Sequence, residues 1–248
     1  MTELKRTIGL PLLLFFGLGN ILGAGIYVLI GKIAGEAGLY TPLAFLVASI
    51  VAGFSAFSYS ELSARYPLSA GVAVYVEEGF HLKPLSRLTG LLIAFAGMVS
   101  SATISHGFYG YFQSFFAAPE ILVITCIVLL LGIITIVGIS QSVSTAAALT
   151  LIEIAGLLLV IWSGKGLLGN MPVDIMLLPP VETSALSGIM LGAFLAFFAF
   201  IGFEDMVNIA EEVKKPRRTL PTGILLALLI ATIIYGLVAL IAVLAVEQ

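Results

Sequence analysis

Charged side chains are scarce in this chain. Lys, Arg, Asp and Glu make up 10% of its 248 residues, against roughly 25% in an ordinary soluble domain. Hydrophobic residues make up 60%, and the mean hydropathy is +1.17. A soluble chain of this size cannot hide so much apolar surface from water. The composition therefore excludes a soluble globular enzyme and a disordered chain, and it indicates that the protein folds in a lipid bilayer.

Cysteine and histidine are also scarce, and positive charge is not in excess. The single cysteine, Cys126, excludes a disulfide scaffold and a cysteine-based metal cluster. His81 and His106 are the two histidines, and the HExxH pattern of a metalloenzyme is missing. The net charge of −3 leaves no general basic patch for nucleic acid. We therefore expect no enzyme activity, no metal site, no cofactor and no nucleic-acid partner.

Seven apolar runs are long enough to cross a bilayer, which takes about 20 mostly apolar residues per helix. Pro42, Pro119 and Pro221 stand at the starts of three runs, where a first helical turn does not use the missing N–H. The connections are interpreted as loops, the longest at about 63–84 and 165–184. The sequence thus predicts an all-α integral membrane protein. It forms a single domain over residues 1–248, with helices at about 8–30, 42–62, 85–111, 119–139, 146–164, 185–210 and 221–246.

The basic residues are distributed unevenly between the two sides of these spans. With the N-terminus in the cytoplasm, Lys32 and Lys165 lie outside and the other nine lie inside. The inner nine are Lys5, Arg6, Arg65, Lys83, Arg87, Lys214, Lys215, Arg217 and Arg218. Cytoplasmic loops carry an excess of Lys and Arg, so we expect a cytoplasmic N-terminus, in the plasma or inner membrane of the cell. The run from Lys214 to Arg218 is interpreted as a solvated anchor that could also touch anionic lipid heads.

Glycines are clustered in the first predicted span, in the run GLGNILGAGIY. Gly17, Gly19, Gly23 and Gly25 fall within nine residues, and each costs about 1 kcal/mol of helix propensity relative to alanine. The cluster therefore favours an unwound segment. Gly19 and Gly23 also form a GxxxG pattern, which on its own usually indicates close helix packing. The first span alone leaves both interpretations open.

Acidic residues interrupt the sixth predicted span, in the run FLAFFAFIGFEDMVN. Glu204 and Asp205 follow Gly202, and two acids at that depth are costly in an unbroken helix that faces lipid. The alternative is a helix end that emerges into water. Together with the glycine cluster, however, the acids favour a pair of broken helices around a buried cavity. Paired breaks present helix N-termini to anionic groups and carbonyl ends to cations, which suits a free α-amino acid.

Three separated segments resemble the amino acid–polyamine–organocation (APC) permeases, namely GLGNILGAGIYVLIGKIAG, ELSARYPLSAGVAVYVEEGF and FFAFIGFEDMVNIAEEVKKPRRTLP. Val72 departs from the pattern, because relatives often carry an acidic residue there. The resemblance implies a LeuT-type helical bundle of two inverted five-helix repeats. Here the first repeat is complete and two helices of the second are present, so we expect a permease truncated after its seventh helix. The missing helices could be needed as a partner, and the sequence does not reveal the oligomeric state.

The resemblance also implies a set of substrate-binding residues. The backbone N–H groups that follow Gly23 would receive the substrate carboxylate, and they belong to Ala24, Gly25 and Ile26. The substrate ammonium would meet the Ile21 carbonyl at the end of the inner half of the first span. The carbonyls of Phe198, Ala199 and Ile201 in the sixth span would complete the ammonium site. Gly202 would be the hinge of the sixth helix, and either Phe198 or Phe200 would close over the ligand.

Two carboxylates are candidates for coupling or pH sensing. Glu153 lies in the middle of the fifth predicted span, and no basic residue is nearby in the sequence. An ionised carboxylate there is expensive, so Glu153 is either a packed, hydrogen-bonded carboxyl or a group that couples transport to a cation. Glu204 corresponds to a position where some relatives carry an acid near the substrate. His106, in the third span, is expected to be a satisfied polar residue of the bundle.

The sequence therefore predicts a secondary active transporter that moves an amino acid by alternating access. We expect proton-coupled symport or exchange, with a proton or a sodium ion as the coupling ion. The apolar character of the expected site residues favours a neutral amino acid. A non-transporting amino acid sensor on the same fold remains an alternative, and so does an inactive fragment of a permease.

Overall fold

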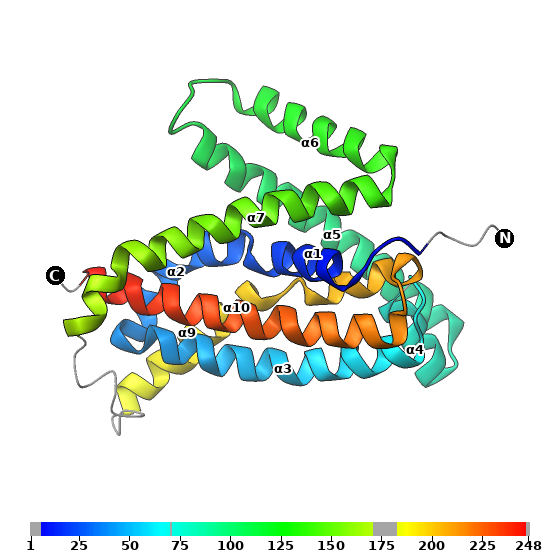
Figure 1. Ribbon diagram of the computed structural model, residues 1–248, viewed down its shortest axis with the longest axis horizontal. Helices are drawn as coiled ribbons and strands as arrows, with labels where there is room; N and C mark the ends of the chain where they lie inside the picture. The colour runs from blue at the N-terminus through cyan, green and yellow to red at the C-terminus, as the bar shows by residue number, and fades with distance from the viewer. Residues whose placement is uncertain (1–5, 70, 171–182, 247–248) are drawn as a thin grey trace.

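The computed structural model describes residues 6–69, 71–170 and 183–246 and is built from helices (Figure 1). No β-strand lies within these ranges, so the prediction of an all-α protein is confirmed. The α-helices are α1 (Leu10–Leu22), α2 (Ala24–Ala37), α3 (Thr41–Arg65), α4 (Val72–Phe80), α5 (Lys83–Phe112), α6 (Glu120–Val137), α7 (Ile139–Ser163), α9 (Thr183–Phe200) and α10 (Pro216–Val246). Three 3₁₀ helices are η1 (Gly38–Tyr40), η2 (Gly164–Asn170) and η3 (Phe203–Glu212).

Six helical stretches within the described residues are long and apolar enough to cross a membrane. They are Gly25–Arg65, Lys83–Phe112, Glu120–Val137, Gln141–Leu168, Thr183–Glu212 and Pro216–Ala245. The first has 41 residues because η1 joins α2 to α3 without a break, while α1 is a shorter apolar helix. This set of helices identifies an integral membrane protein.

Two expectations about the connections are wrong. The stretch 63–84, predicted as a loop, contains the helix α4. This short helix packs its Tyr75 side chain into the core. Its Ala73 carbonyl accepts a 2.7 Å hydrogen bond from the Ser86 hydroxyl of α5. The last helix begins at Pro216, so Pro221 lies inside α10 rather than at its start. Of the stretch 165–184, residues 171–182 lie outside the described residues.

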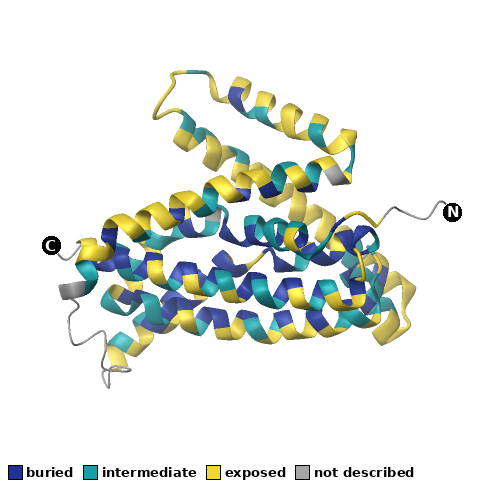
Figure 2. Cartoon of the chain, in the orientation of Figure 1, coloured by how far each residue is buried: buried dark blue, intermediate teal, exposed yellow. Residues whose placement is uncertain are grey.

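The core of the bundle lies between α1, α2, α3, α9 and α10 (Figure 2). Alanines make the close approach possible: Ala44, Ala48, Ala52 and Ala56 form a buried stripe at every fourth residue of α3. Small residues at such spacing let helix backbones approach each other in a membrane. By contrast, α6 stands apart from the bundle, and both α5 and α6 are mostly exposed (Figures 1 and 2). The helices that carry the predicted breaks are therefore central, and α5 and α6 are peripheral.

The end of the bundle that holds the N-terminus is tied by hydrogen bonds between distant segments. The Ile8 N–H donates to the Glu212 carbonyl at 3.0 Å, and the Lys214 N–H donates to the Ile8 carbonyl at 2.8 Å. Beside them, the Ser69 N–H donates to the Glu211 carboxylate at 3.3 Å and the Glu211 N–H donates to the Ser69 hydroxyl at 3.2 Å. These bonds join the start of α1, the end of α3 and the end of η3.

Candidate functional site

The first predicted span is broken at Gly23. Helix α1 ends at Leu22 and α2 begins at Ala24, with Gly23 between them at φ −60° and ψ −143°. The N–H groups of the first turn of a helix have no partner inside that helix. The groups predicted to receive a carboxylate, on Ala24, Gly25 and Ile26, stand in this first turn of α2. The Ile21 carbonyl lies in the last turn of α1.

The second break separates α9 from η3 at Ile201 and Gly202. Gly202 has φ +131°, a region that residues with a side chain rarely adopt. Its N–H donates a 2.8 Å hydrogen bond to the Glu204 carboxylate, which folds back over the start of η3. The Phe198 carbonyl, predicted to help hold the substrate ammonium, accepts a 3.4 Å hydrogen bond from the Ile201 N–H. Both predicted breaks are therefore present, and Glu204 is a structural part of the second.

The two breaks touch each other. A Cβ atom added at Gly25 would lie 2.6 Å from the Cα of Ala199, and one added at Gly202 would lie 2.5 Å from the carbonyl oxygen of Asn20. Only glycine fits at such distances. The close contact brings the start of α2 against the end of α9, so the predicted substrate-binding residues of both helices are gathered at one place. For the same reason, a larger residue at Gly25 would disturb the packing as well as any bound carboxylate.

The glycines of the first predicted span serve both for close helix packing and for the helix break, the two interpretations that the sequence leaves open. A Cβ at Gly17 would lie 2.3 Å from the Met206 sulfur of η3, and one at Gly19 would lie 2.1 Å from the Thr150 hydroxyl of α7. These two glycines are packing contacts. Gly23 has only an ordinary 3.6 Å contact and forms the break.

Tyr235 of α10 joins the two breaks, and sequence reasoning missed it. Its hydroxyl lies within hydrogen-bond distance of the Ile21 carbonyl and 3.0 Å from the Ala199 carbonyl, so its one proton is shared between the two acceptors. The ring is fully buried against Phe45 and Phe200, with centroid distances of 5.5 and 5.1 Å. Ile21 and Ala199 carry two of the carbonyls predicted to hold the substrate ammonium. The available signal was a tyrosine within the long apolar run of the last span.

The two phenylalanines proposed as a gate have different surroundings. Phe200 is fully buried between Phe45 and Tyr235 and lies in the core of the bundle. In this conformation Phe200 is packed away from the surface, and its role as a gate stays a prediction. Phe198 is 53% exposed and stacks edge-on with Phe194 at 5.9 Å. Phe198 is the more exposed residue of the pair.

Glu153 of α7 faces a cavity of about 460 Å³ beside the first break, which we call the α7 cavity. The polar residues that share this cavity are Asn20, Tyr27 and Thr150. Asn20 is the residue whose carbonyl touches Gly202, so the α7 cavity borders the contact between the two breaks. Glu153 thus lies in a cavity next to the contact between the breaks.

Glu204 and Asp205 face a different cavity of about 620 Å³ between α3, α5 and the second break, which we call the α5 cavity. Its other polar lining residues are Tyr59, Thr89, Ser100, Ser101 and Asn208. Asp205 accepts a 3.4 Å hydrogen bond from the Asn208 amide. The structure therefore does not bring Glu153 and Glu204 together, and each lies on its own side of the breaks.

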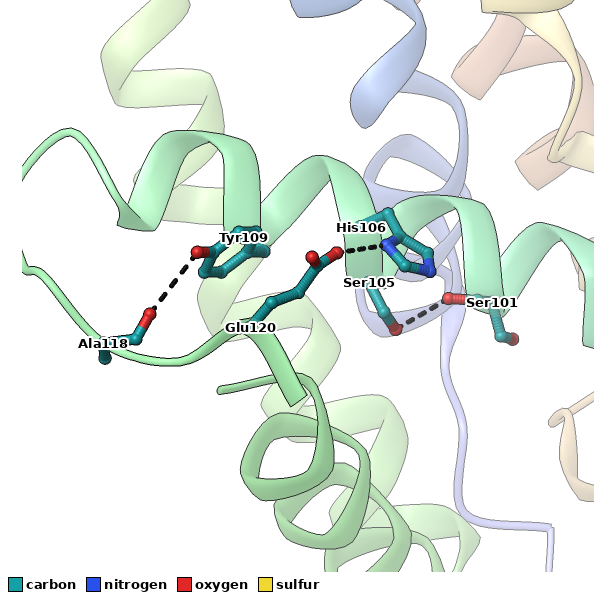
Figure 3. A network of polar contacts seen from close by, with 6 residues as sticks. All are labelled: Ser101, Ser105, His106, Tyr109, Ala118 and Glu120. Carbon is teal, nitrogen blue, oxygen red and sulfur yellow. Dashed lines mark hydrogen bonds and ion pairs between the residues drawn. The ribbon is translucent and has the colours of Figure 1, made fainter. Parts of the chain in front are cut away.

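His106 lies outside the candidate site, near the end of α5 (Figure 3). Its Nδ1 is 2.8 Å from the carboxylate of Glu120 at the start of α6, and both side chains are about half exposed or more. In the same region the Tyr109 hydroxyl donates to the Ala118 carbonyl at 3.4 Å (Figure 3). His106 is a satisfied polar residue, as predicted, but it joins α5 to α6 at the surface rather than inside a bundle.

Comparison with known proteins identifies the family. A family model described as amino acid permease matches residues 8–248. The chain belongs to the amino acid permease family. The resemblance to APC permeases is thereby confirmed, while the LeuT-type arrangement of inverted repeats stays a prediction.

Relatives of the chain bear the names of transporters. Cationic amino acid transporter 3, mitochondrial, of Arabidopsis thaliana is 30% identical over 257 residues, which cover 96% of this chain and 42% of that protein. The branched-chain amino acid permease BcaP of Bacillus subtilis is 31% identical, with 94% and 53% covered. The methylthioribose transporter of the same species is 29% identical, with 96% and 55% covered. The chain spans about half the length of the curated relatives that it matches. Their names agree with the expectation that it is not an enzyme.

Proposed function

We propose that this permease carries an amino acid across the membrane by alternating access around the two helix breaks. The observation that supports the proposal is the contact between the breaks, where Gly25 at the start of α2 meets Ala199 near the end of α9. Helix starts carry partial positive charge and helix ends partial negative charge. A zwitterion at this contact would meet a favourable charge at both of its ends.

Each end of the substrate has its own partners in this proposal. The carboxylate binds the N–H groups at the start of α2, on Ala24, Gly25 and Ile26. The ammonium binds the carbonyls of Ile21, Ala199 and Ile201. Since a carbonyl oxygen has two lone pairs, Ile21 and Ala199 can accept from the ammonium while the Tyr235 hydroxyl still holds them. Gly23 and Gly202 are the hinges about which the half-helices turn.

The membrane orientation is part of the proposal. The end of the bundle with Arg6, Arg65 and the Lys214–Arg218 run carries most of the positive charge, which favours a cytoplasmic position for that end. Helices α1 and η3 then face the cytoplasm, and α2 and α9 face outward. Opening of the bonds between Ile8 and Glu212 and between Ser69 and Glu211 would admit the substrate from the cytoplasm.

Uptake measurements on proteoliposomes test the proposal. A panel of labelled neutral, cationic and branched amino acids should be tried with and without a pH gradient. The chain and any longer version of its reading frame should be compared, because the relatives are about twice as long. We expect saturable uptake of at least one amino acid. Binding without flux in both versions would favour the sensor, and flux in the longer version alone would identify this chain as an inactive part of a permease.

Glu153 and Glu204 are proposed to couple transport to protons. Each pH unit of a gradient contributes about 1.4 kcal/mol per coupled proton, so wild-type uptake should rise as the external pH falls. Glutamine imitates the protonated acid. Glu153→Gln should therefore remove most of the pH dependence of uptake while exchange of internal for external substrate continues. Glu204→Gln should also weaken the bond to the Gly202 N–H, because a carboxylate is the stronger acceptor.

The matched control is Glu120→Gln, which makes the same change on the surface near His106. It should keep the wild-type pH profile. A Glu153→Gln protein with an unchanged pH profile would contradict the coupling role and leave Glu153 as a packed carboxyl of the α7 cavity.

A further inference from the structure

Four basic side chains line one pocket at the N-terminal end of the bundle. Arg6, Lys215, Arg217 and Arg218 surround a volume of about 480 Å³ together with Pro67 and Pro216. Three segments that are distant in the sequence form it: the chain before α1, the loop after α3 and the residues where α10 begins, 215–218. The fold therefore brings Arg6 next to the basic run at 215–218, which is far from it in the sequence. We call this site the basic pocket and propose that it binds a phosphate group.

The positive charge of the basic pocket is not neutralised by the protein. Within the described residues, none of its four cations forms an ion pair, and the ion pairs present join Arg65 to Glu61 and His106 to Glu120. The nearby Glu211 carboxylate is turned to the Ser69 N–H. Four like charges around one volume repel one another, and an anion bound between them relieves this repulsion.

Phosphate is the anion that this set of residues fits best. Arginine presents a planar fork of donors that matches phosphate oxygens, and lysine adds a compact point charge. Lys215 stands immediately before the 31-residue helix α10, and Arg217 and Arg218 lie in its first turn. The partial positive charge of a helix start favours an anion at the same place.

The position of the basic pocket favours the phosphate of a lipid headgroup. The apolar span Pro216–Ala245 begins at the pocket, so the pocket lies at the level where phospholipid headgroups meet the protein. It also adjoins the bonds that tie Ile8 to Glu212 and Lys214. A headgroup held by Arg6 and Lys215 at once would connect the start of α1 with the turn after η3, and so keep this end of the bundle closed. A free phosphate ion offers the same chemistry without the lipid tails.

Thermal unfolding of the purified full chain in neutral detergent measures this binding. The probes are dioctanoyl phosphatidic acid, dioctanoyl phosphatidylcholine and inorganic phosphate, at constant ionic strength. The variant is the pair K215Q/R217Q, and its control is K83Q/K214Q, which removes the same charge from exposed lysines that do not line the pocket. We expect phosphatidic acid to raise the Tm of the wild type and the control, with an apparent Kd that is at least about tenfold weaker for K215Q/R217Q.

The outcomes separate the two sources and do not depend on transport. Stabilisation by phosphatidic acid but not by inorganic phosphate supports a lipid headgroup, and equal stabilisation by both supports a free phosphate group. Stabilisation that is the same in both double variants, or absent with every anionic probe, overturns the proposal. If K215Q/R217Q does not fold, the single variants R217Q and K214Q repeat the comparison with one charge removed from each.

Discussion

Replacing Gly202 by alanine should abolish substrate binding and lower the free energy of unfolding by more than about 3 kcal/mol, a loss that few single substitutions cause. Two costs add at this position. The φ of +131° is unfavourable for any residue with a Cβ, which costs on the order of 1–3 kcal/mol. The new Cβ would also lie 2.5 Å from the Asn20 carbonyl oxygen. The backbone of the first break would have to move away from the second.

Gly53→Ala is the matched control for this prediction. Gly53 lies inside α3, and a Cβ added there meets nothing within 4 Å. Alanine in a helix interior gains about 1 kcal/mol over glycine, so this variant should be as stable as the wild type or more so. Thermal unfolding and a scintillation proximity assay of amino acid binding measure both effects. A Gly202→Ala protein that binds its substrate normally would show that the second break need not hold its observed backbone shape.

The helix breaks could be predicted from the sequence because they follow from local composition. Glycine opposes helix formation wherever it stands, so the run from Gly17 to Gly25 weakens the first span without knowledge of the fold. Glu204 and Asp205 are costly at membrane depth for an equally local reason. What local composition could not decide is the use of each glycine. Gly19 packs on Thr150 while Gly23 forms the break, and this difference depends on the position of α7.

The parts of the site that could not be predicted depend on which helix faces lie together. Phe198 and Phe200 are two residues apart and equally apolar, yet one is exposed and the other is buried against α3 and α10. The nine residues of α4 are too few for a span, so the sequence predicts a loop there, although Tyr75 packs into the core. Tyr235 is separated by 214 positions from its partner Ile21. No pattern in the sequence pairs a phenol with a carbonyl at that distance.

Tyr235→Phe should weaken amino acid binding about tenfold and lower the free energy of unfolding by about 2 kcal/mol, the cost of leaving a buried acceptor without its donor. The change keeps the ring that packs between Phe45 and Phe200 and removes only the hydroxyl. The Ile21 and Ala199 carbonyls then lose the group that holds α1 and α9 at a fixed distance. The same two carbonyls are predicted to bind the substrate ammonium, so the variant should hold them less precisely and bind the substrate more weakly.

The matched control is Tyr109→Phe, which removes a hydroxyl bonded to the Ala118 carbonyl at the α5–α6 connection, away from the breaks (Figure 3). It should leave substrate affinity unchanged. Because the Tyr235 hydroxyl stands beside the carbonyls that the ammonium needs, the sign of the change in affinity distinguishes two roles for it. Weaker binding in Tyr235→Phe means that the hydroxyl organises the site. Tighter binding would mean that it competes with the ammonium for Ile21 and Ala199, and the substrate would then have to displace it.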